Sequence, residues 1–177
     1  MGTLTGGAGV EAVLNDLARK VERGGTLRVG FLEGATYPDG TSVAMVAATQ
    51  NYGAPGRGVP PRPFFSKMIA DKSSGWAKSL KAVFRAANYD GRKALELFGE
   101  GVAGQLREAI VNMADPPLSP VTLLLHDRFP MNEGYTFADV LQARRDIAAG
   151  ETPSGAHANP LIWSGHLLNS VDKEVVS

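Results

Sequence analysis

Ser164, His166 and Asp172 are the closest this chain comes to a nucleophile, a base and an orienting acid. A hydrolytic triad uses these residue types, but it is defined by geometry in space and not by closeness in sequence. Ser164 stands in Trp-Ser-Gly and lacks the G-x-S-x-G pattern that presents a nucleophile on a sharp turn. The sequence therefore favours a turn serine beside a surface histidine, and a hydrolase is the weakest of three functional hypotheses.

Metal and cofactor chemistry finds little support in the residue types. Cysteine is absent, and His126, His157 and His166 show no metal-ligand spacing. The glycines at 6–9 follow no strand and precede no Gly-Lys-Ser/Thr, and Gly99-x-Gly101-x-x-Gly104 lies inside a helical pattern. We expect no catalytic residue, no metal, no cofactor and no enzyme activity. We interpret the second glycine motif as a groove for close helix packing.

Positive charge is concentrated in one stretch of a neutral chain. Residues 57–93 hold nine basic and two acidic residues, which gives a net charge of +7. The rest of the chain holds nine basic and sixteen acidic residues, which gives a net charge of −7. Lys78, Lys81 and Arg85 recur at helical spacing, opposite an apolar stripe. A solvated face is the simplest interpretation. The alternatives are a patch for nucleic acid or for an acidic face of a neighbouring subunit, and the neutral total favours the neighbour.

The elements that position these residues follow from hydrophobic periodicity. The chain has 177 residues, of which 44% are hydrophobic, as in an ordinary globular domain. An alternating pattern predicts a strand at 26–32, and a second strand is expected near the end, at 170–176. The predicted fold class is α+β: one helix-rich domain, 1–177, with a small, mostly antiparallel sheet. Helices are predicted over about 10–23, 43–52, 64–88, 91–113, 121–127 and 136–149.

Three segments depart from this regular pattern. Residues 1–9 are glycine-rich and predict a flexible N-terminus, and residues 53–63 are rich in proline and glycine and predict an irregular arm. Residues 129–158 are interpreted as an inserted helix and loop. The chain shows no signal-peptide pattern and no long uncharged apolar stretch, so we expect a soluble protein.

Short motifs occur in a recognisable order along the chain. The first half holds Val29-Gly-Phe-Leu-Glu-Gly, Tyr37-Pro-Asp-Gly-Thr, Gln50-Asn-Tyr-Gly and Val59-Pro-Pro-Arg-Pro-Phe-Phe. The second half holds Asp115-Pro-Pro-Leu-Ser-Pro-Val-Thr and Asn159-Pro-Leu-Ile-Trp-Ser-Gly-His-Leu-Leu-Asn-Ser-Val. In this order they resemble the tailed-bacteriophage tail-completion and head–tail joining proteins, the HK97 gp10-like and virion-morphogenesis group related to the lambda minor tail protein Z. The resemblance spans roughly residues 27–177.

The resemblance implies a structural virion protein with a tail-terminator or neck-like fold. Such a protein forms an oligomeric ring, hexameric by family analogy, that completes the head-proximal end of the tail and joins tail to head. Its partners would be copies of itself, the phage tail tube or tail terminator protein, and the head connector or adaptor protein. The resemblance also implies possible non-specific contact with DNA in the channel, and it implies no membrane partner. The ring would be assembled in the host cytoplasm and reside in the neck of the virion.

The motifs make physical sense as shape devices. Prolines stiffen the arm, and Arg62 is expected to contact an acidic group across an interface. Phe64 and Phe65 are assigned equally to an interface or to the core, Ser164 is expected to cap a turn, and Gly165 to permit it. The interface candidates are Pro61, Arg62, Pro63, Phe64, Phe65, Lys78, Lys81, Arg85, Leu161, Trp163, Ser164, Gly165 and Leu167. The alternative function is a DNA-binding assembly factor that uses the basic segment 57–93.

Overall fold

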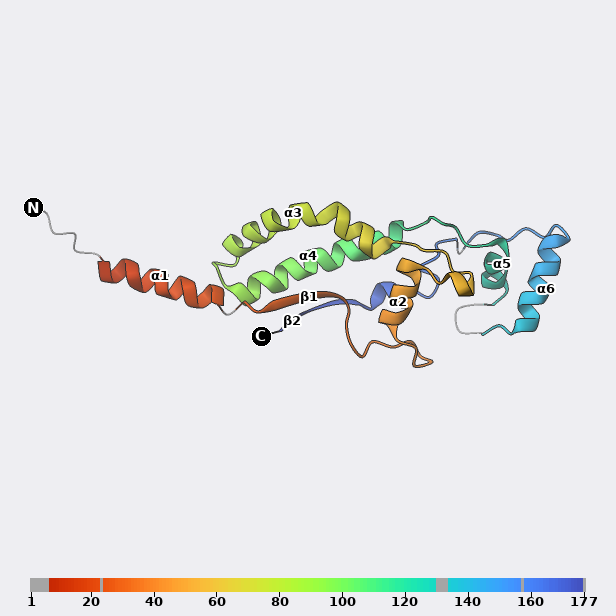
Figure 1. The fold of residues 1–177 in the computed structure, drawn as a ribbon, viewed down its shortest axis with the longest axis horizontal. Coiled ribbons are helices and arrows are strands. Elements are labelled where there is room, and N and C mark those ends of the chain that lie inside the picture. The colour runs from red at the N-terminus through yellow and green to blue at the C-terminus, as the bar shows by residue number, and fades with distance from the viewer. Residues whose placement is uncertain (1–6, 23, 130–133, 157, 177) are drawn as a thin grey trace, which may run out of the picture.

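The computed structural model describes residues 7–22, 24–129, 134–156 and 158–176. These residues form a helix-rich α+β fold with a two-stranded antiparallel sheet, which confirms the predicted class (Figure 1). The order is α1 (Gly7–Glu22), β1 (Thr26–Phe31), α2 (Val43–Tyr52), the short 3-10 helix η1 (Pro55–Arg57), α3 (Phe64–Ala86), α4 (Gly91–Asn112), α5 (Pro120–Arg128), α6 (Phe137–Ala148), α7 (His166–Asn169) and β2 (Val171–Val176).

The sheet joins the first and last strands of the chain. β1 pairs with β2 from Thr26 opposite Val176 to Phe31 opposite Val171. α4 packs against this pair and also against α3, which runs back along it (Figure 1). The main core is therefore built from α2, α3, α4 and the sheet. Its largest fully buried side chains are Val43, Phe64, Leu106, Ile110 and Val171.

Gly99 allows α4 to approach the sheet closely. A Cβ on Gly99 would lie 2.7 Å from Leu27 Cδ1 and 2.8 Å from Lys173 Cδ. Gly101 and Gly104 have no such neighbour within 4 Å. The packing interpretation of the glycine motif is thus right for Gly99 and wrong for the other two, because they lie on the solvent side of the helix.

Side-chain caps fix the starts of four helices at the positions that the sequence offers. Ser42, Asp90, Ser119 and Thr136 each accept a hydrogen bond from a backbone N–H in the first turn. These bonds satisfy donors that the helix itself leaves without a partner. At Thr136 the bond is part of a reciprocal capping box with Asp139. Local sequence therefore determines these boundaries.

α5 and α6 form a helical pair with a small core of their own, at the end of the molecule opposite α1 (Figure 1). Leu124 and Leu125 of α5 pack with Ala143 of α6. The expected insertion at 129–158 therefore includes α6 but pairs it with α5, which begins earlier. The arm at 53–63 is irregular, as expected, apart from η1.

α1 begins at Gly7, so the helix predicted from about residue 10 starts three residues earlier, inside the glycine-rich segment. The rest of that segment, residues 1–6, lies outside the described residues. Within the described residues, no helix combines the length and the apolar character needed to cross a membrane.

Candidate functional site

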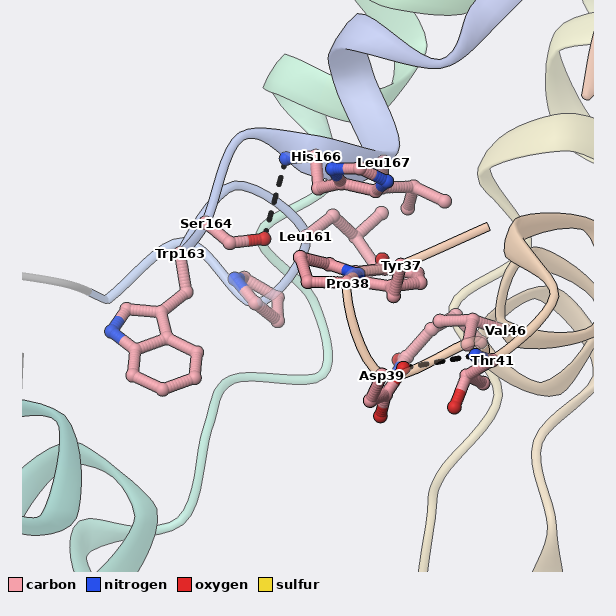
Figure 2. Close-up of a pocket in the computed structure, with 12 residues that line it drawn as sticks. Tyr37, Pro38, Asp39, Thr41, Val46, Leu161, Trp163, Ser164, His166 and Leu167 are labelled. Atoms are coloured by element: carbon pink, nitrogen blue, oxygen red, sulfur yellow. Dashed lines mark hydrogen bonds between the residues drawn. The ribbon is translucent and has the colours of Figure 1, made fainter. Parts of the chain in front are cut away.

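The first and last motifs meet around a cavity of about 500 Å³ (Figure 2). On one side lies the turn from Tyr37 to Thr41, and on the other the turn that carries Ser164 and His166. The rings of Tyr37 and His166 are 4.4 Å apart, and His166 Nε2 lies 3.0 Å from the carbonyl oxygen of Thr36. Segments separated by some 125 residues in sequence thus share one surface.

The turn at residues 37–41 is closed by hydrogen bonds within itself. The backbone N–H of Thr41 donates to Asp39 Oδ1 at 2.9 Å, and that of Tyr37 donates to the carbonyl of Thr41 at 2.8 Å. Hydrogen bonds from Thr41 hold the pKa of the Asp39 carboxyl below its ordinary value, whereas burial, then the charge of Asp39, raises the pKa of Tyr37. At neutral pH the rim of the cavity therefore presents an exposed carboxylate beside a neutral phenol.

The turn at residues 164–167 follows the predicted chemistry. Gly165 adopts φ 65°, a left-handed conformation that side chains with a Cβ avoid. Ser164 Oγ accepts a hydrogen bond from the backbone N–H of His166 at 3.3 Å, which is the expected cap. Leu161 and Leu167 are buried on either side and anchor the turn in the main core.

The hydrolase hypothesis requires a bond between the Ser164 hydroxyl and the His166 ring. In the described residues the Ser164 hydroxyl instead accepts a hydrogen bond from the backbone N–H of His166. The His166 ring contacts the carbonyl oxygen of Thr36. Asp172 accepts from the backbone of Lys173. The structure therefore brings Ser164 and His166 close together without the contacts of a nucleophile and base.

Arg62 joins the proline-rich arm to the Asp115-Pro-Pro motif. Its guanidinium donates from Nε to the carbonyl of Pro116 at 3.0 Å, from Nη2 to that of Pro117 at 3.4 Å, and from Nη1 to Gln50 Oε1 at 3.1 Å. The residue is only 4% exposed, and burial lowers its pKa from the ordinary arginine value. These donors point into the chain, so the expected contact between Arg62 and an acidic group of another subunit does not fit the structure.

Asn51 is a functional residue of the motif region that the sequence analysis missed. Its Oδ1 accepts the backbone N–H groups of Phe65 and Ser66 at 3.0 and 3.1 Å, and so caps α3 from a distance. The residue at the helix start, Pro63, provides no side-chain cap. The signal in the sequence was the absence of Ser, Thr, Asp or Asn directly before α3, which leaves the first N–H groups of that helix to be capped by a residue from elsewhere.

The aromatic candidates divide between core and surface. Phe64 is 1% exposed and packs edge-to-face with Phe31, which assigns it to the core, whereas Phe65 is half-buried. Trp163 stacks on His126 of α5, with ring centroids 4.1 Å apart and planes 1° from parallel. Trp163 therefore ties the last motif to the α5–α6 pair. Pro61 and Pro63 are exposed.

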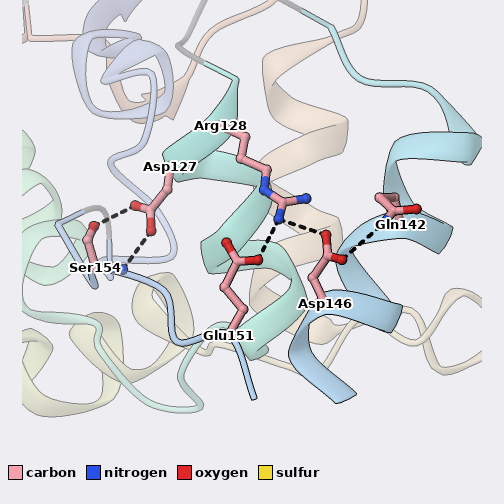
Figure 3. Close-up of polar contacts among 6 residues, drawn as sticks. All are labelled: Asp127, Arg128, Gln142, Asp146, Glu151 and Ser154. Atoms are coloured by element: carbon pink, nitrogen blue, oxygen red, sulfur yellow. Dashed lines mark hydrogen bonds and ion pairs between the residues drawn. The ribbon is translucent and has the colours of Figure 1, made fainter. Parts of the chain in front are cut away.

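The basic candidates lie on the outer face of α3. Lys78, Lys81 and Arg85 are all exposed, and none of them forms an ion pair with the described residues. A different arginine shows the contrast: Arg128 of α5 contacts Asp146 of α6 at 2.7 Å and Glu151 at 2.8 Å (Figure 3). The α3 face thus carries positive charge that no acidic side chain of the described residues pairs, whereas the ion pairs of Arg128 join α5 to α6 and to Glu151.

No group of three or more His, Cys, Asp or Glu side chains in the described residues has the arrangement of a metal site. Comparison with protein-family models, with curated proteins and with solved structures finds no match. The function must therefore be argued from the motifs and from the way in which the fold groups them.

Proposed function

We propose that this chain is a structural virion protein that completes the head-proximal end of a phage tail and joins the tail to the head as an oligomeric ring. The surface around the Tyr37–Thr41 turn and the Ser164–Leu167 turn would meet the neighbouring ring or tube. The basic face of α3 would meet an acidic protein surface or the DNA that passes through the channel.

The observation that carries this proposal is the grouping of the motifs. The Tyr37–Thr41 turn faces the last motif across one cavity, and Arg62 of the proline-rich motif is bonded to the carbonyls of Pro116 and Pro117. In the Gln50-Asn-Tyr-Gly motif, Gln50 accepts a hydrogen bond from Arg62, and Asn51 accepts one from the backbone N–H of Phe65 at the start of α3. Segments that share only their order in sequence thus belong to one connected region, which supports treating the resemblance as a single functional unit.

The direct test is electron microscopy of virions made without this protein. We expect heads and tails to accumulate separately, and complete tails that stay joined to heads would contradict the proposal. A plasmid-borne copy should restore joining. A copy with Asp39→Lys, which reverses the charge at the cavity rim, should restore it poorly, whereas Glu108→Lys, a reversal at an exposed position of α4, should restore it fully.

A DNA-binding assembly factor is the second candidate, and it is favoured by the charge of Lys78, Lys81 and Arg85, which form no ion pair with the described residues. Phosphate contacts of this kind give binding that falls steeply with salt. We would measure binding to duplex DNA between 50 and about 200 mM salt, where a site with six or more phosphate contacts loses on the order of 10³-fold in affinity. If a variant with Lys78→Glu, Lys81→Glu and Arg85→Glu bound DNA as the wild-type chain does, this candidate would be excluded.

A further inference from the structure

α1 carries an apolar stripe that its own chain leaves uncovered. Val13, Leu14 and Val21 recur at helical spacing and are 67%, 58% and 46% exposed. The helix extends beyond the end of the α3–α4 pair, away from the rest of the fold (Figure 1). An amphipathic helix with its apolar side in water is typical of a segment that binds elsewhere.

The same chain has an apolar groove that its described residues leave partly exposed. A cavity of about 400 Å³ opens along β1, α3 and α4. Its walls include Leu27, Ile69, Trp76, Leu80, Leu95 and Phe98. Most of these side chains are half-buried, and Ile69 is 38% exposed, so the groove is accessible from outside.

A glycine contact directs α1 away from this groove in its own chain. A Cβ on Gly91, the first residue of α4, would lie 2.8 Å from the carbonyl oxygen of Val21 and 2.9 Å from Cα of Gly24. The backbone after α1 is therefore seated against the start of α4, at the tip of the α3–α4 pair. With this contact in place, α1 continues outward from the α3–α4 pair (Figure 1), and Val13 and Leu14 stay exposed.

We propose that α1 of one copy lies in the groove between β1, α3 and α4 of a second copy. The sizes agree: α1 has 16 residues, about 24 Å of helix, and the groove runs beside helices of 23 and 22 residues. Docking an apolar stripe into a groove is a common mode of helix recognition. α1 holds three acidic and two basic residues, a net charge of −1, so its charge is compatible with an acceptor segment of net charge +7.

Donor and acceptor are different surfaces of the chain, so each copy gives one helix and receives another. Such head-to-tail contacts produce rings when the rotation closes. The inference deepens the proposed function by naming the joint between subunits, and it rests on the self-assembly part of that proposal. The rival occupants of the groove are the chain's own α1, folded back, and an unrelated protein.

The test uses two full-length variants with complementary defects. The donor variant, Leu14→Glu with Val21→Glu, places charge in the apolar stripe of α1. The acceptor variant, Ile69→Glu with Leu80→Glu, places charge in the apolar groove. Native mass spectrometry and light scattering would measure the assembly state of each at several concentrations. We expect the wild-type chain to form oligomers, each variant alone to be monomeric, and an equimolar mixture to form a dimer, because one intact helix then meets one intact groove.

Matched controls separate this joint from general damage. Ala12→Glu with Asn15→Glu adds the same charge to the other side of α1, and Leu97→Glu adds charge to an exposed apolar position of α4 outside the groove. Both should assemble like the wild-type chain. Circular dichroism would confirm folding, and Ile69→Glu alone replaces the acceptor variant if the double change unfolds.

Two results would overturn the proposal. A wild-type chain that stays monomeric, with α1 folded onto its own groove or left to another protein, excludes exchange between copies. Oligomers that survive the donor variant, or a mixture that stays monomeric, exclude this joint while leaving the ring itself possible through another surface. Conversely, virions that join heads to tails without the protein would remove the virion role and leave the joint intact.

Discussion

The two ends of this molecule use amphipathic helices in opposite ways. At one end α6 buries Ala143 completely and packs its half-buried Val140 and Ile147 against α5. At the other end α1 exposes Val13 and Leu14 to water. Both helices have apolar residues at the spacing of a helix turn, so periodicity alone does not separate them.

The difference lies in what the connecting segments allow. α5 and α6 follow one another, and Arg128 reaches across to Asp146 and Glu151, which holds the pair together (Figure 3). The end of α1 and Gly24 are seated against Gly91 at the tip of α4, and α1 continues outward from the α3–α4 pair (Figure 1). An amphipathic helix is thus a component of the fold at one end, and at the other it is exposed and, in our proposal, binds a second copy.

The largest expected effect is at the α5–α6 end of the molecule, which we call the closed end; the α1 end is the open end. Leu125→Ala removes a side chain that is 3% exposed in the small α5–α6 core. Truncation of a buried leucine costs about 2–5 kcal/mol, so the helical pair should open at much lower denaturant concentration. Hydrogen exchange of the α6 amides would measure this opening. Leu141→Ala, at a partly exposed position of α6, is the control, and equal protection in both variants would contradict the assigned core.

The next effect is at the contact that directs α1. Gly91→Ala places a methyl group within 3 Å of the backbone at Val21 and Gly24, and backbone cannot move aside like a flexible side chain. Overpacking of this kind costs about 1–3 kcal/mol, and we expect it to displace α1 as well. Urea unfolding and distances between spin labels on α1 and α4 would measure both results.

Gly101→Ala is the matched control for that change, because it adds a methyl group to the same helix in open space. It should stabilise α4 by about 0.5–1 kcal/mol, since glycine in a helix interior is less favourable than alanine. If both alanines behaved alike, the contact between Gly91 and the end of α1 would be absent in solution.

A smaller effect is expected from acid at the closed end. A hydrogen bond from Arg128 holds the pKa of the Asp146 carboxyl below its ordinary value, and Thr136 does the same for Asp139. A lowered pKa in the folded state gives stability that is present above the unfolded pKa, about 4, and is lost as pH falls through the folded value. Melting of the helical pair between pH 6 and pH 2.5 should show this loss, and Asp146→Asn should reduce it. A flat profile in the unchanged chain would contradict the ion pair.

Local features of the fold could be predicted from sequence because they depend only on residues that are neighbours in the chain. Ser42, Asp90, Ser119 and Thr136 cap the helices that begin directly after them in the sequence, and the terminal strand was expected where β2 occurs. A cap or a left-handed glycine acts within a few residues of itself. The pattern of one segment is then sufficient.

The candidate site was harder, because its contacts join distant segments. Arg62 has the chemistry of an interface residue, and only the position of Pro116 and Pro117, 54 and 55 residues later, makes it internal. Gly99 and Gly101 read alike in sequence and differ only in what faces them. The uncovered side of α1 was missed for the same reason, since periodicity reports an apolar stripe but not whether a partner reaches it.

The smallest expected effect is at the open end, in the stability of the single chain. Leu14→Gln replaces a side chain that is mostly in water, and such surface changes alter the free energy of unfolding by about 0.5 kcal/mol or less. Urea unfolding at low protein concentration should therefore give the same midpoint for both chains. At higher concentration the wild-type chain should gain stability by association, and the variant should gain less, because binding to the folded state raises apparent stability by mass action. A large loss at low concentration would show that α1 is covered within its own chain, and the contrast between the two ends would disappear.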